Sequence, residues 1–319
     1  MDYFSGIIGQ ERALVPLRRA LETGRINHAY LFIGPGGTGK YTTAAAFARA
    51  LILMDDAPGE AYIDNNVHPD LMVVEKAENK TLIGIEQINQ VIEPWLALKP
   101  YRASRRVVIV KEAHLLSIPA ANALLKTLEE PPGHAVIIML SDELSLLETI
   151  VSRCQVIRFS PLLEASIKDF LMGRGIDVAN AAQLASMGQG SIAAALHLAE
   201  EENREELWNI ARSILNELST GQEIEVFKCA EIMEKAPALL VRLLMNLLRD
   251  IYIYQSTGRE DLLLIDSNLE LAKCFKQLNP TRVQPALLII DDLRKQYRGP
   301  VNSLLLSINI SYQLWDALK

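Results

Sequence analysis

The sequence predicts an α/β domain on a parallel five-stranded sheet, then a small helical lid domain and an all-helical C-terminal domain. Two observations support this fold class. Up to Pro161 short β-rich runs alternate with helix-patterned segments, and beyond Pro161 the β signal disappears. Alternating strands and helices form parallel sheets through right-handed crossovers. The expected domain boundaries are 1–161, 162–203 and 204–319.

Five runs in the first domain are expected to be strands. The third and fourth consist almost entirely of β-branched and apolar residues, which is typical of strands covered by helices on both faces. The expected strands span residues 28–34, 70–76, 106–112, 134–141 and 155–161.

Helices are expected between these strands and throughout the rest of the chain. In the first domain they fall at about 39–53, 84–97, 117–130 and 145–151. Residues 164–200 predict three short helices, interrupted at Gly173–Gly175 and Gly188–Gly190. The acidic run 200–206 is interpreted as a solvated helix start or linker. The helically spaced leucines within 239–248 are interpreted as core or subunit-contact residues.

The composition is that of a soluble globular protein. Half of the 319 residues are apolar and 22% are charged, and no apolar run is long enough for a membrane span. The first residues do not resemble a signal peptide, so we expect a cytoplasmic protein with no membrane partner. The net charge of -7 argues against a general nucleic-acid coat protein. The cationic segment 99–111 is compatible with a DNA contact, a subunit contact or a solvated loop.

The three cysteines do not form a recognisable metal or disulfide pattern. Cys154, Cys229 and Cys274 lie far apart in the sequence, which fits neither a disulfide framework nor a C-x-x-C metal site. We expect them to be reduced, mostly buried thiols.

A phosphate-binding loop follows the first expected strand and opens the next helix, as the mechanism of such a loop requires. Its glycines allow backbone N–H groups to surround phosphate oxygens at a helix N-terminus, and its lysine supplies an ammonium group for the outer phosphates. The candidate nucleotide-binding residues of this loop are Gly34, Gly36, Gly37, Thr38, Gly39, Lys40 and Tyr41.

The groups that would hold magnesium are altered. Tyr41 stands where a Ser or Thr would offer a short hydroxyl to the ion, and its own hydroxyl lies at the far end of a rigid ring. In the third strand the expected acidic pair reads Lys111–Glu112, so a cation replaces a carboxylate that would attract the metal. Glu112 could still polarise a water molecule. We therefore expect a site that binds phosphates, holds no metal and does not hydrolyse ATP.

Four segments, in this order and spacing, resemble bacterial DNA polymerase III clamp-loader subunits. They are 8-IGQERALVPLRRAL-21, 28-HAYLFIGPGGTGK-40, 120-AANALLKTLEEPP-132 and 152-SRC-154. The resemblance implies an AAA+ α/β domain with a lid, and a helical collar that joins subunits into a five-membered ring. In this family the gamma and tau subunits hydrolyse ATP, whereas the delta prime subunit is usually an inactive stator.

The chain departs from the motor subunits at Tyr41, at Lys111 and at Ala193, where a motor subunit places a lid arginine on the phosphates. Family members often carry four cysteines as a zinc knuckle before the second strand. Residues 55–70 contain none, so we expect no zinc and interpret His68 as a turn or packing residue.

The resemblance assigns a catalytic role in trans to Arg153, in Ser152-Arg153-Cys154. The family's arginine finger projects into the ATP site of the neighbouring subunit, where a guanidinium can accelerate phosphoryl transfer by about a thousandfold or more. The alternative is an ordinary salt-bridged surface arginine.

Three further expectations concern the bound nucleotide. Ser141, at the end of the fourth strand, could sense the γ-phosphate or simply cap the strand. If Lys40 and Lys111 both point at the loop, the second ammonium could replace the charge of the missing metal, and ADP or ATP would bind without magnesium. The site would instead be empty if Tyr41 folds over the loop.

These observations together favour a delta-prime-like clamp-loader subunit. It is expected to assemble with gamma/tau and delta subunits and to support loading of the sliding clamp onto primer–template DNA. One alternative is an active gamma/tau-like ATPase that tolerates Tyr41, and another is a regulatory P-loop protein outside replication. A P-loop kinase fits least, because no lid arginine or acceptor site is recognisable.

Overall fold

The computed structural model describes residues 2–78, 80–142, 146–200, 204–264, 268–275, 278–298 and 301–319. The chain separates into two compact units, each described here by itself. The first comprises Met1–Ile176 with Gly188–Ala195, and the second Asp177–Met187 with Leu196–Lys319. The three-domain division stays a prediction.

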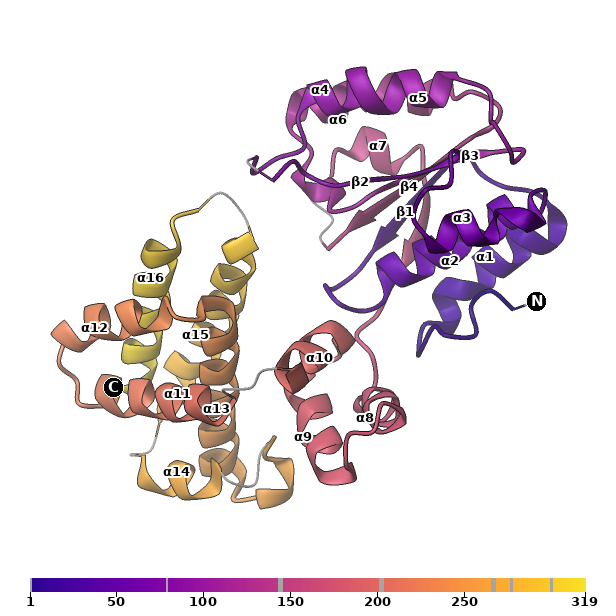
Figure 1. Ribbon diagram of the computed structural model, residues 1–319. Coiled ribbons are helices and arrows are strands. Elements are labelled where there is room, and N and C mark those ends of the chain that lie inside the picture. The colour runs from indigo at the N-terminus through magenta and orange to yellow at the C-terminus, as the bar shows by residue number, and fades with distance from the viewer. Residues whose placement is uncertain are drawn as a thin grey trace. The chain divides into compact units, whose positions relative to one another are not determined.

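The first unit contains a five-stranded parallel sheet with the strand order β2-β3-β4-β1-β5 (Figure 1). All five strands lie within the predicted ranges, and every residue of β1, β3 and β4 is buried. The α/β fold class is thus confirmed. The strands are β1 (Ala29–Ile33), β2 (Leu71–Val74), β3 (Arg106–Val110), β4 (Ala135–Ser141) and β5 (Gln155–Arg158).

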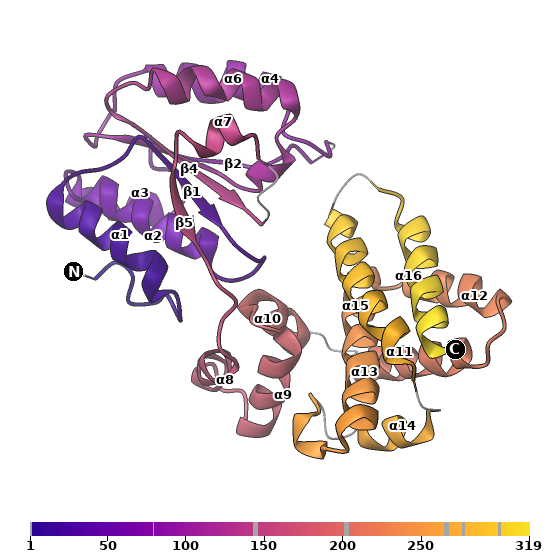
Figure 2. The ribbon, with the colours of Figure 1, turned by 180° about the vertical axis from the view of Figure 1, so that it is seen from behind.

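Helices cover both faces of this sheet, so the unit has three layers (Figures 1 and 2). Tyr30 points to one layer and packs edge-on against Phe47 with ring centroids 5.0 Å apart. The next strand residue, Leu31, points to the other layer with Leu124. One layer contains α1 (Glu11–Thr23), α2 (Lys40–Leu53), η1 (Ala57–Gly59) and α3 (Glu60–Asp64). The other contains α4 (Ile85–Gln87), η2 (Ile88–Ile92), α5 (Glu93–Ala97), η3 (Ala113–Leu115), α6 (Ile118–Glu129) and α7 (Glu148–Val151).

The helix expected over 84–97 is interrupted. Between α4 and α5 the chain forms a π-helical turn, η2, which ends immediately before Glu93 and Pro94. Proline has no N–H to donate to the preceding turn, and its ring clashes with the carbonyl four residues back. A wider turn before Pro94 relieves both problems. The helix expected over 145–151 is α7, and residue 145 lies outside the described residues.

The three short helices expected over 164–200 are confirmed, with both glycine interruptions. They are α8 (Glu164–Gly173), α9 (Val178–Gly188) and α10 (Ile192–Glu200). Residues 188–195 belong to the first unit, where Leu162 N–H donates to the Gly190 carbonyl at 2.9 Å. In the acidic run 200–206, residues 201–203 lie outside the described residues.

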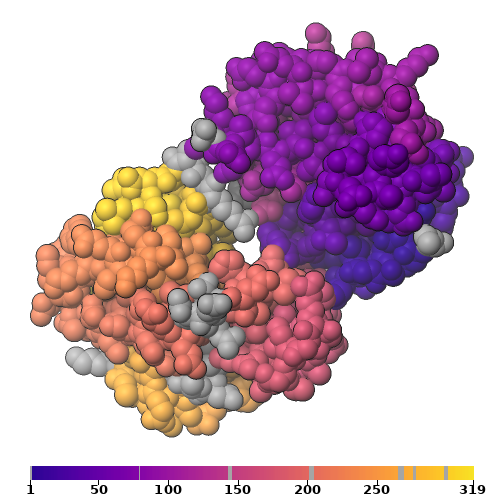
Figure 3. All heavy atoms as spheres, viewed as in Figure 1, coloured from indigo at the N-terminus to yellow at the C-terminus, as the bar shows by residue number. Residues whose placement is uncertain are grey.

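The regular elements among the described residues of the second unit are all helices, and its part from residue 204 onward is drawn in orange to yellow in Figure 3. Leu240, Leu243, Leu244, Leu247 and Leu248 are buried in α13, which confirms the interpretation of this stretch as core, although Leu239 is only half-buried. The remaining elements are α11 (Arg204–Ser219), α12 (Ile224–Met233), α13 (Pro237–Thr257), η4 (Glu260–Leu262), α14 (Asn268–Cys274), α15 (Pro280–Lys295), η5 (Gln296–Arg298) and α16 (Ser303–Leu318). Among the described residues, no helix has the length and apolarity needed to cross a membrane.

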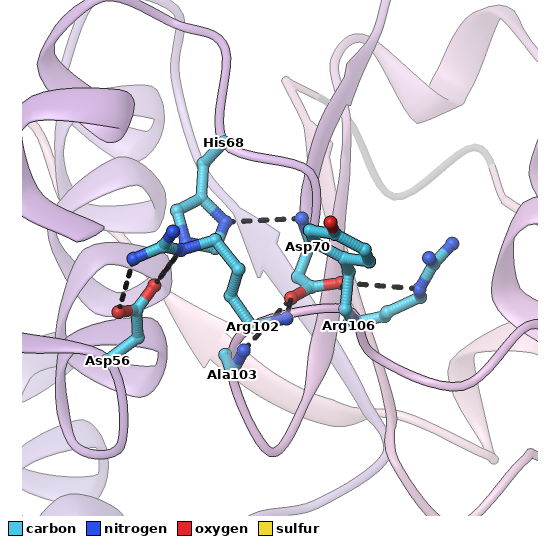
Figure 4. Close-up of polar contacts among 7 residues, drawn as sticks. Asp56, His68, Asp70, Arg102, Ala103 and Arg106 are labelled. Atoms are coloured by element: carbon cyan, nitrogen blue, oxygen red, sulfur yellow. Dashed lines mark hydrogen bonds and ion pairs between the residues drawn. The ribbon is translucent and has the colours of Figure 1, made fainter. Parts of the chain in front are cut away.

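A buried carboxylate organises the loop that precedes β3. Asp70 accepts hydrogen bonds from the backbone N–H groups of Tyr101, Arg102 and Ala103 at 2.7, 2.7 and 3.0 Å (Figure 4). The Arg106 guanidinium lies 3.5 Å from the same carboxylate. These interactions stabilise the charge of a carboxylate that is fully buried. They also fix the conformation of residues 101–103.

A second carboxylate joins this loop to the segment before β2. Asp56 accepts from Arg102 Nε at 2.7 Å and Nη2 at 3.0 Å, and His68 Nε2 lies 3.2 Å away. The Arg102 hydrogen bonds, assisted by His68, lower the pKa of Asp56 to about 2. His68 Nδ1 accepts from Asp70 N–H at 3.1 Å, so the ring proton lies on Nε2 and faces Asp56. The interpretation of His68 as a packing and turn residue matches these contacts.

Candidate nucleotide site and trans arginine

The phosphate loop lies at the carboxyl edge of the sheet, between β1 and α2. Gly34 N–H donates to the Ser141 carbonyl at 3.2 Å, so the loop begins beside the end of β4. A Cβ on Gly34 would lie 2.2 Å from the Phe159 carbonyl oxygen, which excludes any larger residue. Gln10 fixes the loop from behind, because its Nε2 donates to the carbonyls of Thr38 at 3.2 Å and Ser160 at 2.8 Å.

Lys40 is folded onto its own loop. Its ammonium donates to the carbonyls of Gly34 and Pro35, both at 2.7 Å, and forms an ion pair with Asp142 at 2.9 Å. The Lys40 side chain is 6% exposed. The Lys40 ammonium is thus already bound by two carbonyls and one carboxylate of its own chain.

Tyr41 and Lys111 contact each other. The Lys111 ammonium lies 4.1 Å from the centre of the Tyr41 ring and is also ion-paired with Glu75. A cation over an aromatic face is attracted by the ring quadrupole, which holds the two side chains together. Lys40 is directed to the loop, but Lys111 is directed to Tyr41 and Glu75, so the expectation that both ammonium groups point at the loop is wrong for Lys111.

The remaining candidate nucleotide residues lie at the same edge of the sheet. Ser141 ends β4 and is buried, whereas Glu112 follows β3 and is half-buried with a left-handed φ of 49°. Ala193 packs against the loop, since its N–H reaches the Gly37 carbonyl at 3.4 Å. A Cβ on Gly37 would lie 2.1 Å from Ser191 Oγ, so this contact requires glycine.

Arg153 lies away from this loop, just after α7. One Nη donates to the Thr149 carbonyl at 2.9 Å, and the other donates to Glu129 Oε1 at 2.6 Å. The adjacent Cys154 is a free thiol, and burial raises its pKa to about 12, so it is not a nucleophile near neutral pH. Of the three cysteines expected to be mostly buried, Cys229 is buried and Cys154 half-buried, but Cys274 is exposed.

The structure brings the loop residues, Ser141 and Glu112 to one edge and leaves Arg153 outside that group. The sequence interpretation missed three residues at these sites, Gln10, Asp142 and Glu129. Gln10 and Glu129 lie within segments that carry the family resemblance, so that resemblance could have drawn attention to them. Nothing in the sequence pattern pointed to Asp142 except its position directly after Ser141.

The arrangement is chemically suited to binding phosphate. Backbone N–H groups at the start of α2 and the Lys40 ammonium are its two phosphate-binding features. Within the part of the chain that the structure describes, no group of three or more His, Cys, Asp or Glu side chains is placed to hold a metal ion.

Residues 9–163 match the family model described as "DNA polymerase III, delta subunit". These residues belong to the family of bacterial DNA polymerase III clamp-loader subunits. The matched residues contain the loop, the sheet and Arg153.

The relatives of this chain include more than one subunit type. It is 30% identical over 306 residues to DNA polymerase III subunit tau of Bacillus subtilis, covering 93% of this chain and 47% of tau. It is 31% identical over 201 residues to subunit delta' of the same organism, covering 60% of each protein. The chain thus spans about half the length of tau.

Among solved structures, a gamma subunit-related protein of Thermotoga maritima matches with a TM-score of 0.48 and 20% identity. That match covers 96% of this chain and 100% of the other.

Proposed function

We propose that this chain is a delta-prime-type subunit of the DNA polymerase III clamp loader. It assembles with gamma/tau and delta subunits and supports loading of the sliding clamp at primer–template DNA. It completes a neighbouring ATP site without turning over ATP itself. The clamp-loader family supports the assembly, and the contact of Lys111 with Tyr41 supports the choice of subunit type.

The Lys111–Tyr41 contact carries the proposal. In an active loop, the residue after the lysine and an acid at the end of the neighbouring strand hold Mg²⁺. Here the first position is an aromatic ring and the second is an ammonium that rests on that ring. That ammonium is already paired with Glu75, so this position offers a divalent cation no free carboxylate. The loop can then bind phosphate oxygens but gains no metal to polarise them.

Arg153 supplies the catalytic contribution under this proposal. It lies on the surface, with its side chain 35% exposed. A guanidinium is suited to a trans role because its planar donors match phosphate oxygens and its charge is permanent. We assign it to the ATP site of the adjacent subunit.

Replacing Arg153 by Ala in the assembled complex should depress DNA-stimulated ATPase and clamp loading while leaving assembly intact. A finger contributes about a thousandfold or more at its own site, so the turnover assigned to that one site should disappear. Steady-state ATPase and loading assays, with gel filtration of the complex, measure the three properties. Arg158→Ala, on an exposed β5 residue, is the matched control. An unchanged ATPase rate in the Arg153 variant would refute the trans role.

We further propose that the loop binds ADP or ATP as a structural ligand without magnesium. A phosphate group would replace Asp142 as the partner of Lys40, and the loop N–H groups would bind the remaining oxygens. Isothermal titration of the chain in excess chelator should give binding heat that Lys40→Ala abolishes. No heat with either nucleotide, or heat only after Mg²⁺ is added, would contradict this.

The match to tau over 93% of this chain favours a second candidate, an active gamma/tau-like ATPase. In that case the purified chain alone would hydrolyse MgATP steadily, and Lys40→Ala would abolish the activity. Our proposal expects no such turnover.

A further inference from the structure

The Arg153 side chain is bound to its own subunit through two different elements. Thr149, whose carbonyl accepts from Nη1 at 2.9 Å, lies on α7. Glu129, whose carboxylate accepts from Nη2 at 2.6 Å, is the last residue of α6. The segments that carry Glu129 and Arg153 are 24 residues apart in the sequence. The guanidinium is therefore folded back onto its own subunit.

This pairing is favourable but weak. The carboxylate lies at the carboxyl end of a helix, where the helix dipole adds to the attraction for a cation. Both side chains are substantially exposed, at 35% for Arg153 and 52% for Glu129, so water and salt screen the pair. A terminal phosphate carries more negative charge than one carboxylate and can bind a guanidinium through two parallel hydrogen bonds. A phosphate of this kind competes successfully with Glu129.

We infer that Glu129 is a positioning residue for Arg153. It holds the guanidinium against its own subunit and releases it when a nucleotide phosphate on the adjacent subunit competes for it. This inference rests on the proposed trans role of Arg153. After release, the Glu129 carboxylate stays solvated, so the exchange leaves no buried unpaired charge.

The competition predicts a specific kinetic signature. Arg153 must break its ion pair with Glu129 before it can bind the nucleotide phosphate, both in the ATP-bound ground state and in the transition state. Glu129 therefore weakens the binding of Arg153 to the phosphate equally in the two states. A uniform effect of this kind changes the ATP concentration needed for half-maximal rate and leaves the saturated rate almost unchanged. A residue needed only for local structure would lower the saturated rate instead.

The test is Glu129→Gln in the assembled clamp loader. The amide keeps the shape of the side chain but loses the charge, so Arg153 is released more readily. We expect the half-saturating ATP concentration to fall by about 1.4- to 5-fold, which corresponds to the usual strength of an exposed ion pair. The saturated rate should change by less than the half-saturating concentration does. The difference from wild type should shrink as salt is raised, because salt screens the pair.

Glu130→Gln is the matched control, since this exposed acid is the next residue in the chain. It should leave the half-saturating concentration unchanged. In an Arg153→Ala background, Glu129→Gln should have no effect. The inference is overturned if Glu129→Gln leaves the half-saturating concentration unchanged or raises it while Arg153→Ala still depresses the rate. If Arg153→Ala itself has no effect, the proposed function fails instead.

Discussion

Each functional cation proposed for this chain is paired with an acid of the same chain. Lys40 pairs with Asp142, Lys111 with Glu75 and Arg153 with Glu129. The local charge at both sites is consequently close to balanced. Phosphate binding at either place is then an exchange of one anion for another, so affinity depends on the difference between two interactions rather than on the full attraction of a free cation.

At the same scale, the pair formed by Asp56 and Arg102 predicts an acid-dependent stability. The folded-state pKa of Asp56 is about 2, below the ordinary value of 3.8. Its stabilising contribution is therefore complete above about pH 4 and is lost as the pH falls towards 2. Arg102→Gln should be less stable than wild type at pH 7, and the difference should shrink between pH 4 and pH 2.

Urea denaturation at several pH values measures that difference as a free energy of unfolding. Arg105→Gln serves as the control, because Arg105 is a half-exposed cation of the same loop. A difference between Arg102→Gln and wild type that stays constant down to pH 2 would disprove the coupling.

At the scale of elements, the sequence predicted the sheet well because its strands are continuous apolar runs. Every strand lies inside its expected range. Three helical features were missed: the interruption within 84–97, the short helix α3 and the helix α1. The helix expected over 84–97 contains Pro94, which is a signal for a break in a helix, and the prediction did not use it. Helix α1 was not predicted as a helix, and it contains Pro16.

The side-chain pairings could not be predicted, because they join residues far apart in the chain. Lys111 and Glu75 are 36 residues apart, and Arg102 and Asp56 are 46 apart. The sequence indicated which residues carry charge at the site. Only the packing of the strands decides which acid meets which base, and this placed Lys111 on Tyr41 and Glu75 rather than at the loop.

At the scale of the whole molecule, the two compact units have separate cores and should unfold separately. Leu31 is buried in the sheet and Leu243 in α13. Replacing a buried leucine by alanine costs about 2–5 kcal/mol. Scanning calorimetry should show two transitions. Leu31→Ala should lower the midpoint temperature of one, and Leu243→Ala should lower the midpoint temperature of the other. A single transition that moves in both variants would show that the units unfold together.

The order of the strands also affects how the chain folds during its synthesis. A ribosome completes β1 at Ile33, but both neighbours of β1 in the sheet, β4 and β5, begin only at Ala135 and Gln155. At about 5–20 residues per second, this apolar strand waits on the order of 5–20 seconds for its first partner. A nascent chain released before that point exposes an unpaired hydrophobic strand, which makes prematurely terminated products of this message prone to aggregate and to engage chaperones.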